Sequence, residues 1–171
     1  NRIKDRNYTK NYFTMGKHLL TITTFILFSI VGIHGQEVSI NEVMPCNIST
    51  QINTDNYNFS GYIELFNGGE KSVNLKGMVL THFKKKGNGD IELKWQWEID
   101  SDLIVDELER YKLIWMDESD KIGHSPYKLD ADGGYLTLYD GTTLIDSFAY
   151  ERGDAHISYG RYNGSVGYMS P

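Results

Sequence analysis

The chain has 171 residues, of which 40% are hydrophobic and 23% charged, and its 17 Lys and Arg residues against 23 Asp and Glu residues give a net charge of −6 at pH 7. Because neutralised phosphates supply most non-specific affinity for nucleic acids, this acidic balance disfavours a nucleic-acid-binding protein. Cys46 is the single cysteine, so no disulfide can form within the chain and a disulfide-stapled scaffold is excluded.

The N-terminal part carries the features of an export signal. A short basic segment that begins at Met15 precedes a mostly apolar stretch, Leu19 to Ile33, and a small residue, Gly35, follows. This order predicts a secretory signal peptide over 15–35 with cleavage after Gly35, and the apolar stretch is shorter than the about 20 residues of a spanning helix. Residues 1–14 are interpreted as a non-native upstream extension. We expect a secreted or cell-envelope protein with no transmembrane anchor apart from the signal peptide.

Cleavage leaves a strongly acidic domain. Residues 1–35 hold five of the 17 Lys and Arg residues and one of the 23 Asp and Glu residues, so residues 36–171 keep 12 against 22, a net charge of about −10 with His neutral. A chain of this length suffices for one hydrophobic core. We therefore expect a single exported domain over 36–171.

Short apolar segments with a period of two follow one another along this domain. Alternate side chains of a strand share a face, and the glycine- and aspartate-rich segments in between supply residues that tolerate tight turns. The expected strands, in chain order, are 37–43, 61–67, 73–80, 92–99, 111–116, 134–140 and 143–150. Strands this short and this often interrupted predict an all-β sandwich or barrel.

For two segments the sequence predicts the structure in more detail. The strand at 92–99 is expected to place four large residues on one inward face, namely Leu93, Trp95, Trp97 and Ile99. The segment 101–111 has apolar residues at helical spacing after Ser101 and is the one helical candidate, of at most a turn or two.

Four aspartates lie among glycines and alternating apolar residues in the segment 128–150. Three of them are expected to form turns: Asp130, Asp132 and Asp140. Asp146 lies inside an expected strand and has no such explanation. The segment from Asp130 begins like an EF-hand loop, but positions six and twelve are Tyr135 and Gly141 rather than Gly and Glu, which excludes that motif. A looser cation site between loops stays open.

No catalytic constellation is recognised in the sequence. The three histidines of the domain are widely separated and lack metal-site spacing: His82, His124 and His156. There is no G-x-S-x-G nucleophile elbow and no Walker loop. We predict no catalytic, cofactor-binding or metal-binding residue, although hydrolysis by paired carboxylates stays open because distances are unknown.

Several motifs stand in the order found in one known family. They are Asn41-Glu42 in SINEVMPCN, Glu64 to Asn67 followed by Leu75 and Gly77 in YIELFNGGEKSVNLKGMVLT, Gly134 to Asp140 in YKLDADGGYLTLYDGTTLIDSFAY, and Tyr159-Gly160-Arg161 in SYGRYNG. On these motifs, residues 38 to 168 resemble the lamin-tail domain as it occurs in exported bacterial proteins. The chain departs from the family at Cys46, where a small polar residue is usual, and at its end, which indicates truncation of the domain at its C-terminal end.

The resemblance implies an immunoglobulin-like antiparallel β-sandwich that serves as a non-catalytic interaction or targeting module, here the N-terminal accessory domain of a larger exported protein. In bacteria this domain is commonly fused to nuclease, phosphatase or spore-coat-kinase-like domains. One alternative is therefore the N-terminal part of an exported enzyme whose catalytic domain lies beyond Pro171. The other is a carbohydrate-binding module.

Two sets of residues are singled out for the site. Glu42 and Glu64 lie in strands, where a buried carboxylate is costly unless paired, and Arg161 is the predicted partner of both in a structural ion pair. Four aromatic residues in turn-rich sequence are the candidate exposed binding surface: Tyr57, Phe59, Tyr159 and Tyr162. A protein or a cell-surface glycan is the expected partner, and the sequence does not distinguish between them.

Overall fold

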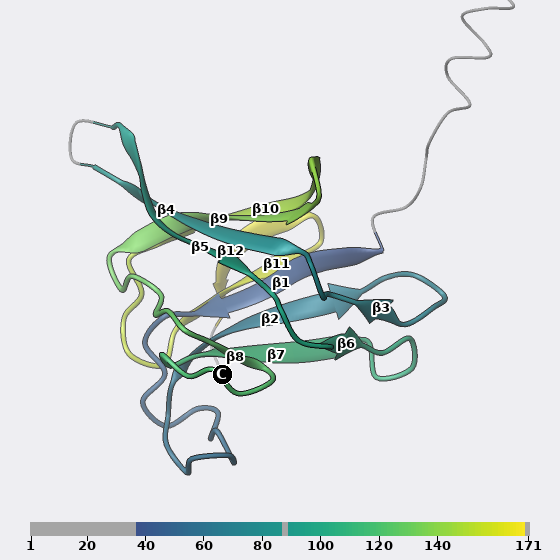
Figure 1. Ribbon diagram of the computed structural model, residues 1–171. Helices are drawn as coiled ribbons and strands as arrows, with labels where there is room; N and C mark the ends of the chain where they lie inside the picture. Colours follow the sequence, from purple (N-terminus) through teal and green to yellow (C-terminus); the bar gives the residue numbers. More distant parts are fainter. Residues whose placement is uncertain (1–36, 87–88, 170–171) are drawn as a thin grey trace, which may run out of the picture. The chain divides into compact units, whose positions relative to one another are not determined.

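The computed structural model describes residues 37–86 and 89–169, and within them the chain forms strands and no helix (Figure 1). The predicted upstream extension and signal peptide lie outside the described residues. The strands are β1 (Val38–Met44), β2 (Gly61–Asn67), β3 (Val73–Asn74), β4 (Val79–Lys85), β5 (Ile91–Glu98), β6 (Ile104–Val105), β7 (Tyr111–Met116), β8 (His124–Ser125), β9 (Gly133–Asp140), β10 (Thr143–Glu151), β11 (Ser158–Tyr162) and β12 (Ser165–Met169). No helix in this part of the chain is long and apolar enough to cross a membrane.

Two sheets make up the sandwich. One has six strands in the order β12-β11-β1-β2-β7-β8, and the other has four in the order β10-β9-β4-β5, while β3 and β6 form a separate short pair. The four-stranded sheet lies over the six-stranded sheet in Figure 1. All pairings are antiparallel except the short one between β7 and β8. The all-β, antiparallel sandwich predicted from the sequence is confirmed.

Alternation along the strands directs one face of each sheet into a common core. In β9, Leu136 and Leu138 are fully buried, whereas Tyr135 and Tyr139 point to the other face and are partly exposed. Burial of each large apolar side chain contributes about 1.5–3 kcal/mol relative to leaving it in water. The core draws on both sheets, with Ile40, Val43, Ile63, Leu65, Leu80, Ile114, Leu136, Leu138 and Phe148 among its members.

The expectation for the tryptophan strand is only partly right. Trp95 and Ile99 are buried and Trp97 packs against the core, but Leu93 is 54% exposed. The register between β4 and β5 shifts so that His82 faces Trp95 while Phe83 faces Leu93. This bulge gives β5 one extra residue, and a one-residue slip moves every following side chain to the opposite face.

The segment that was a candidate helix contains β6 and a single turn. Asp106 accepts hydrogen bonds from the backbone N–H groups of Leu108 and Glu109 at 2.7 and 3.2 Å, and the chain then enters β7. A side-chain acceptor of this kind holds a turn without needing further helical residues.

The predicted turn roles of three aspartates are confirmed. Asp130 accepts the N–H of Asp132 at 3.0 Å on its side chain and the N–H of Gly133 at 3.3 Å on its carbonyl. Asp140 pairs with Thr143 across a two-residue connection whose first residue, Gly141, has φ 55°. Positive φ at this position favours glycine and explains the Asp-Gly sequence.

Asp146, which no turn explains, forms the ion pair of Arg161. The guanidinium Nη2 lies 2.7 and 2.8 Å from the two carboxylate oxygens of Asp146. Arg161 also donates to the carbonyls of Ile40 at 2.7 Å and Ser147 at 2.8 Å, while the carboxylate accepts the N–H groups of the same two residues, each at 2.7 Å. One side-chain pair therefore satisfies four backbone groups of two different sheets.

The predicted ion pair with Glu42 and Glu64 is thus corrected, because Arg161 has a different carboxylate partner. Glu42 and Glu64 face each other across β1 and β2. Each is held by a neutral donor, Glu42 by the Tyr62 hydroxyl at 2.8 Å and Glu64 by the Asn41 amide at 2.7 Å. Burial is the main cause that raises the pKa of Glu64, and the charge of Glu42 adds to it.

We predict that Arg161→Met lowers the free energy of unfolding by about 3 kcal/mol, measured by urea denaturation. The substitution leaves the Asp146 carboxylate buried without its cation and leaves the carbonyls of Ile40 and Ser147 without their donor. The value lies at the lower end of the range for broken buried pairs because 34% of the Arg161 side chain is exposed, against 8% for Asp146.

The matched control is Lys76→Met. Lys76 pairs with Asp102 at 3.5 Å with both side chains more than half exposed, so its removal should cost less than about 1 kcal/mol. Equal losses in the two variants would contradict a tying role for Arg161.

Candidate binding groove

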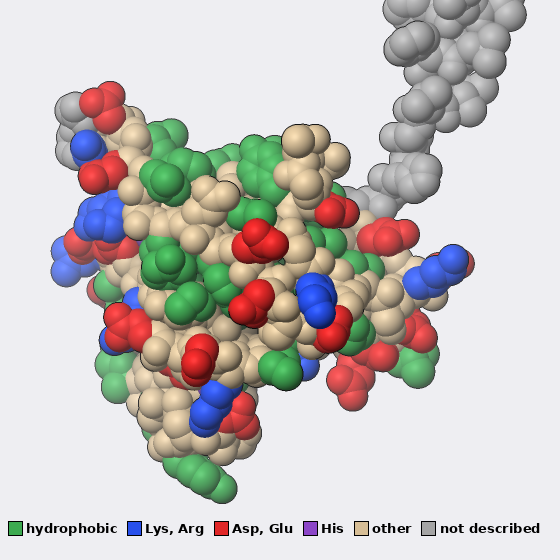
Figure 2. Space-filling view, viewed as in Figure 1, with side chains coloured by type: hydrophobic (Ala, Val, Ile, Leu, Met, Phe, Trp, Pro, Cys, Tyr) green, Lys and Arg blue, Asp and Glu red, His purple; other side chains and the backbone are tan. Residues whose placement is uncertain are grey.

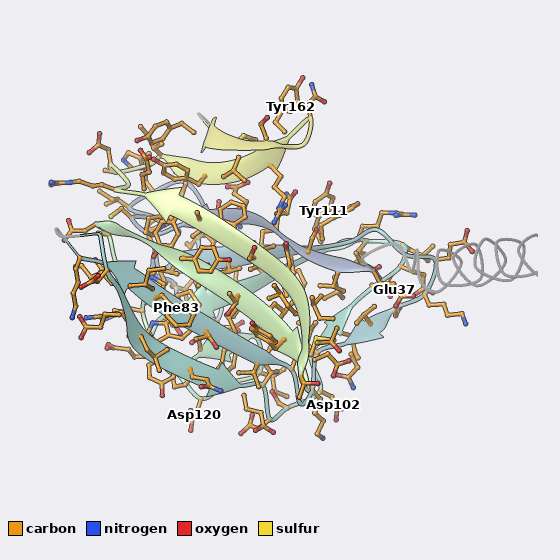
Figure 3. All side chains as sticks on the ribbon, turned by 90° about the horizontal axis from the view of Figure 1, so that it is seen from above. Glu37, Phe83, Asp102, Tyr111, Asp120 and Tyr162 are labelled. Carbon is orange, nitrogen blue, oxygen red and sulfur yellow. The ribbon has the colours of Figure 1, made fainter. Side chains whose placement is uncertain are left out.

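The four aromatic residues predicted as an exposed surface do not gather in one place. Tyr57 and Phe59 are 82% and 42% exposed in the loop between β1 and β2, and Tyr162 is 71% exposed at the end of β11, near the hairpin turn (Figure 3). Tyr159 is buried, with 4% of its surface exposed. The predicted surface is therefore wrong as a unit, and only Tyr159 takes part in the groove described next.

A groove of about 920 Å³ lies where the end of β10 passes the β11–β12 hairpin. We call it the β10 groove; its apolar and aromatic lining residues are Phe83, Ile91, Tyr135, Ala149, Tyr150, Tyr159, Val166 and Tyr168. Figure 3 looks down on the four-stranded sheet and shows the β11–β12 hairpin extending beyond β10. The six-stranded sheet thus reaches further than the four-stranded sheet, which leaves a step along β10.

A row of tyrosine rings in tilted contact forms the floor of this step. The Tyr150 ring lies 6.4 Å from that of Tyr159, which in turn lies 4.4 Å from that of Tyr168. Tyr150 and Tyr159 are buried, whereas Tyr168 is 60% exposed and Val166 is 42% exposed. The ladder of rings therefore leads from the core to an uncovered apolar floor, and aromatic rings of this kind contribute large contact areas to binding sites.

The Tyr159 hydroxyl is a buried polar group of the groove. It lies close to the Tyr168 hydroxyl and to the backbone of Glu151. Burial first, and then the neighbouring Tyr168 hydroxyl, raise the pKa of Tyr159, so it stays protonated. A buried hydroxyl is costly unless it is hydrogen-bonded, so a ligand that offers an acceptor here would be favoured.

The outer end of the groove carries charge. Asp132, Glu151 and Arg152 line it. Lys84 lies 2.8 Å from Asp130 and 3.4 Å from Asp132, which neutralises part of the negative charge on that side. Figure 2 shows hydrophobic side chains over β4, β9 and β10, with acidic and basic side chains around them.

The apolar surface continues from the groove onto the outer face of the four-stranded sheet. Phe83 lies opposite Tyr135, and Tyr135 lies opposite Ala149, so the three side chains form one row across β4, β9 and β10. The bulge in β5 adds Leu93 to the same row. A second hollow of about 420 Å³ on this face shares Phe83 and Tyr135 with the groove.

His82 supports the groove from inside. Its ring is buried between Trp95 and Tyr150, and its Nε2 lies 3.0 Å from the Tyr150 hydroxyl. That hydroxyl donates its one proton to the Asp130 carbonyl at 3.1 Å, so Nε2 of His82 must be the donor to Tyr150. Burial lowers the pKa of His82 to about 4. The histidine is neutral at pH 7 and helps to fix the ring that starts the ladder.

The other two histidines hold loops in place. His124 is buried, with Nδ1 2.9 Å from Asp117 and Nε2 2.9 Å from Asp55, so the imidazole ties the β1–β2 loop to the segment after β7. The bond to His124 is the main cause that lowers the pKa of Asp55. His156 meets the hydroxyls of two residues of the same loop, Ser49 and Thr50, at 3.3 and 3.4 Å.

Within residues 37–86 and 89–169, no three or more His, Cys, Asp or Glu side chains are grouped so that they could hold a metal ion. At His124 the reason is geometric, because the two carboxylates lie on opposite nitrogens of one ring and cannot converge on a common point.

Sequence reasoning missed most of the groove. Val166 and Tyr168 follow the last motif that the strand pattern covered, and nothing in their own spacing marks them as a floor. Ala149 looks like any small residue of a strand. An available signal was the SYGRYNG segment, since a second strand after its Asn-Gly turn would have placed Tyr168 opposite Tyr159, as the register does.

A scan with models of protein families gives no match to the chain, and a search of curated proteins gives none either.

We predict that His82 makes the stability of the domain depend on pH between about 4 and 6.5. Its pKa in the folded protein, about 4, lies below the value of 6.5 expected when unfolded, so the unfolded chain binds the proton first. The contribution of neutral His82 to the free energy of unfolding is fully present above pH 6.5, and it falls by up to about 3 kcal/mol as the pH drops to 4.

Urea denaturation at a series of pH values, for the wild type and for His82→Gln, measures this contribution. The difference between their unfolding free energies should shrink as the pH falls from 6.5 to 4, because the amide cannot be protonated in this range. Parallel pH profiles would show that His82 is not held neutral by burial.

Proposed function

We propose that this domain is a non-catalytic interaction module of a secreted or cell-surface protein, and that it binds its ligand in the β10 groove. The observation that carries the proposal is the uncovered apolar floor of Val166 and Tyr168 beside the buried hydroxyl of Tyr159. Apolar concave surfaces with a few convergent polar groups are the usual form of binding sites.

The engagement of the titratable side chains supports binding rather than catalysis. Asp146 and Arg161 tie backbone groups together, His82 holds a tyrosine, and His124 bridges two carboxylates. A catalytic acid, base or nucleophile needs a face open to the substrate. In these residues the reactive atoms already contact other parts of the protein.

The sequence motifs add the wider setting. The likeness of residues 38 to 168 to lamin-tail domains favours an immunoglobulin-like module that targets or attaches a larger exported protein. The predicted signal peptide over 15–35 supports export of the domain. A fold alone does not determine a function, so the proposal rests on the groove and takes only its biological setting from the resemblance.

We predict that replacing Tyr168 by Ala weakens ligand retention at least about tenfold. Exposed aromatic rings supply a large share of binding energy at interfaces, and Tyr168 is the most exposed ring of the floor. The measurement is retention of the labelled full chain on a peptide array and on a glycan array, with apparent affinities for each retained ligand.

Tyr57→Ala is the matched control, since Tyr57 is 82% exposed and belongs to the β1–β2 loop. Ligands of the groove should be retained equally by the wild type and by this control. Equal retention by all three proteins, or no retained ligand on either array, would contradict the proposed function.

A further inference from the structure

We infer that the ligand of the β10 groove is an extended polypeptide segment, which adds as a strand to the unpaired edge of β10 and carries no net negative charge. This inference rests on the proposed function and specifies the class of partner. Strand addition to a sheet edge is a general mode of peptide recognition, in which main-chain hydrogen bonds provide much of the affinity.

The two halves of the β10 edge differ. β10 pairs with β9 alone and is the outermost strand of its sheet. In the first half, the edge groups of Ser147 are both taken, the N–H by Asp146 at 2.7 Å and the carbonyl by Arg161 at 2.8 Å. This arrangement blocks the first half, because no backbone group of Ser147 is left for another strand.

In the second half of the β10 edge, no such side chains among the described residues occupy the backbone groups of Ala149. Along a strand, the backbone groups of every second residue point to the same edge, so the N–H and C=O of Ala149 point the same way as those of Ser147. The register of β10 against β9 is regular from Asp146 to Glu151, so the alternation holds. β12 lies beside this end of β10 but does not pair with it, and within the described chain no strand pairs with the outer edge of β10. Ala149 therefore presents a donor and an acceptor at an exposed edge.

The surroundings of Ala149 fit a guest strand on both faces. Toward the core side, every second guest side chain would rest on the uncovered floor of Val166 and Tyr168. On the outer side, the guest would extend the row formed by Phe83, Tyr135 and Ala149. The small Ala149 side chain leaves room for a larger neighbour in that row.

Charge complementarity selects the kind of peptide. With the Lys84 pairs counted, Asp130, Asp132 and Glu151 face Lys84 and Arg152 at the groove, so a small acidic excess remains. Residues 36–171 carry a net charge of about −10, from 12 Lys and Arg against 22 Asp and Glu residues. An acidic peptide would be repelled, whereas a neutral or basic one would be attracted at the encounter. The expected ligand alternates apolar or aromatic residues with neutral or basic ones.

The test uses the full chain and a synthetic peptide of the sequence Lys-Val-Lys-Tyr-Lys-Val-Lys, capped at both ends, with titration calorimetry and amide chemical shifts as readouts. We expect saturable binding that shifts the amide signals of Ala149 and Tyr168. The variant Ala149→Pro removes the edge N–H without breaking the ladder to β9 and should weaken binding about tenfold or more.

Ala149→Thr is the matched control, because it changes the same side chain, keeps the N–H and suits a strand. It should bind the peptide within about threefold of the wild type if backbone pairing dominates. Unfolding midpoints of the two variants show whether the proline also disturbs the fold.

A second arm leaves the protein unchanged and alters the peptide. Methylation of the backbone nitrogens of the Lys residues and of those of the Val and Tyr residues gives two peptides with the same side chains. In an antiparallel guest strand, residues directly opposite each other point to the same face, so a Lys residue lies opposite Ala149 and its backbone N–H faces β10. Only the peptide methylated at the Lys nitrogens should therefore lose binding.

The outcomes distinguish strand addition to β10 from binding in the groove as such. Loss of binding for Ala149→Pro and for one methylated peptide supports strand addition. Peptide binding that ignores both changes, or retention of glycans alone through Tyr168, overturns strand addition and leaves the groove as a binding site. Dimerisation of the free chain through β10, seen by sedimentation and abolished by Ala149→Pro, would assign the edge to a second copy and overturn the inference.

Discussion

The ion pair of Asp146 and Arg161 is the interaction on which the rest of the structure depends. The Asp146 carboxylate accepts the N–H groups of Ile40 in β1 and Ser147 in β10, and Arg161 donates to the carbonyls of the same two residues. The pair therefore links the backbones of the two sheets by hydrogen bonds. The guanidinium also lies 5.4 Å from the centre of the Phe148 ring. A charge pair that is largely removed from water stabilises only when its remaining hydrogen bonds are satisfied, and here the backbone satisfies them.

This tie determines where the sandwich is closed and where it is open. Near Ser147 the edge of β10 is held against the six-stranded sheet, and toward Glu151 the same edge runs past the β11–β12 hairpin without pairing. Natural proteins protect sheet edges with charges, bulges or covering segments. β10 has a bulge before Asp146 and the ion pair after it, but nothing equivalent at Ala149. The groove follows from this asymmetry, and its tyrosine floor makes the uncovered end a place for a partner rather than a simple defect in the sheet.

The sequence predicts most of the longer strands because alternation and turn residues are local properties, and the Asp-Gly turn at Asp140 formed as expected. The single strand expected over 73–80 is wrong, because a turn divides it into β3 and β4, and β11 and β12 were not expected. It fails where non-local geometry decides. The bulge that turns Leu93 outward depends on the pairing with β4, and the choice of Asp146 over Glu42 and Glu64 as the partner of Arg161 depends on how the two sheets meet. The four aromatic residues predicted as a surface were selected for turn-rich context, whereas the groove is built by strand edges, which no single segment reveals.

The most direct test of this account is site-resolved amide hydrogen exchange in the free full chain. We predict that the amides of Ile40 and Ser147, which donate to Asp146, exchange only with global unfolding, whereas the amide of Ala149 exchanges orders of magnitude faster. Arg161→Met should bring Ser147 toward the rate of Ala149. Equal protection of Ser147 and Ala149 in the wild type would contradict the claim that the ion pair covers one half of the β10 edge and leaves the other half unpaired.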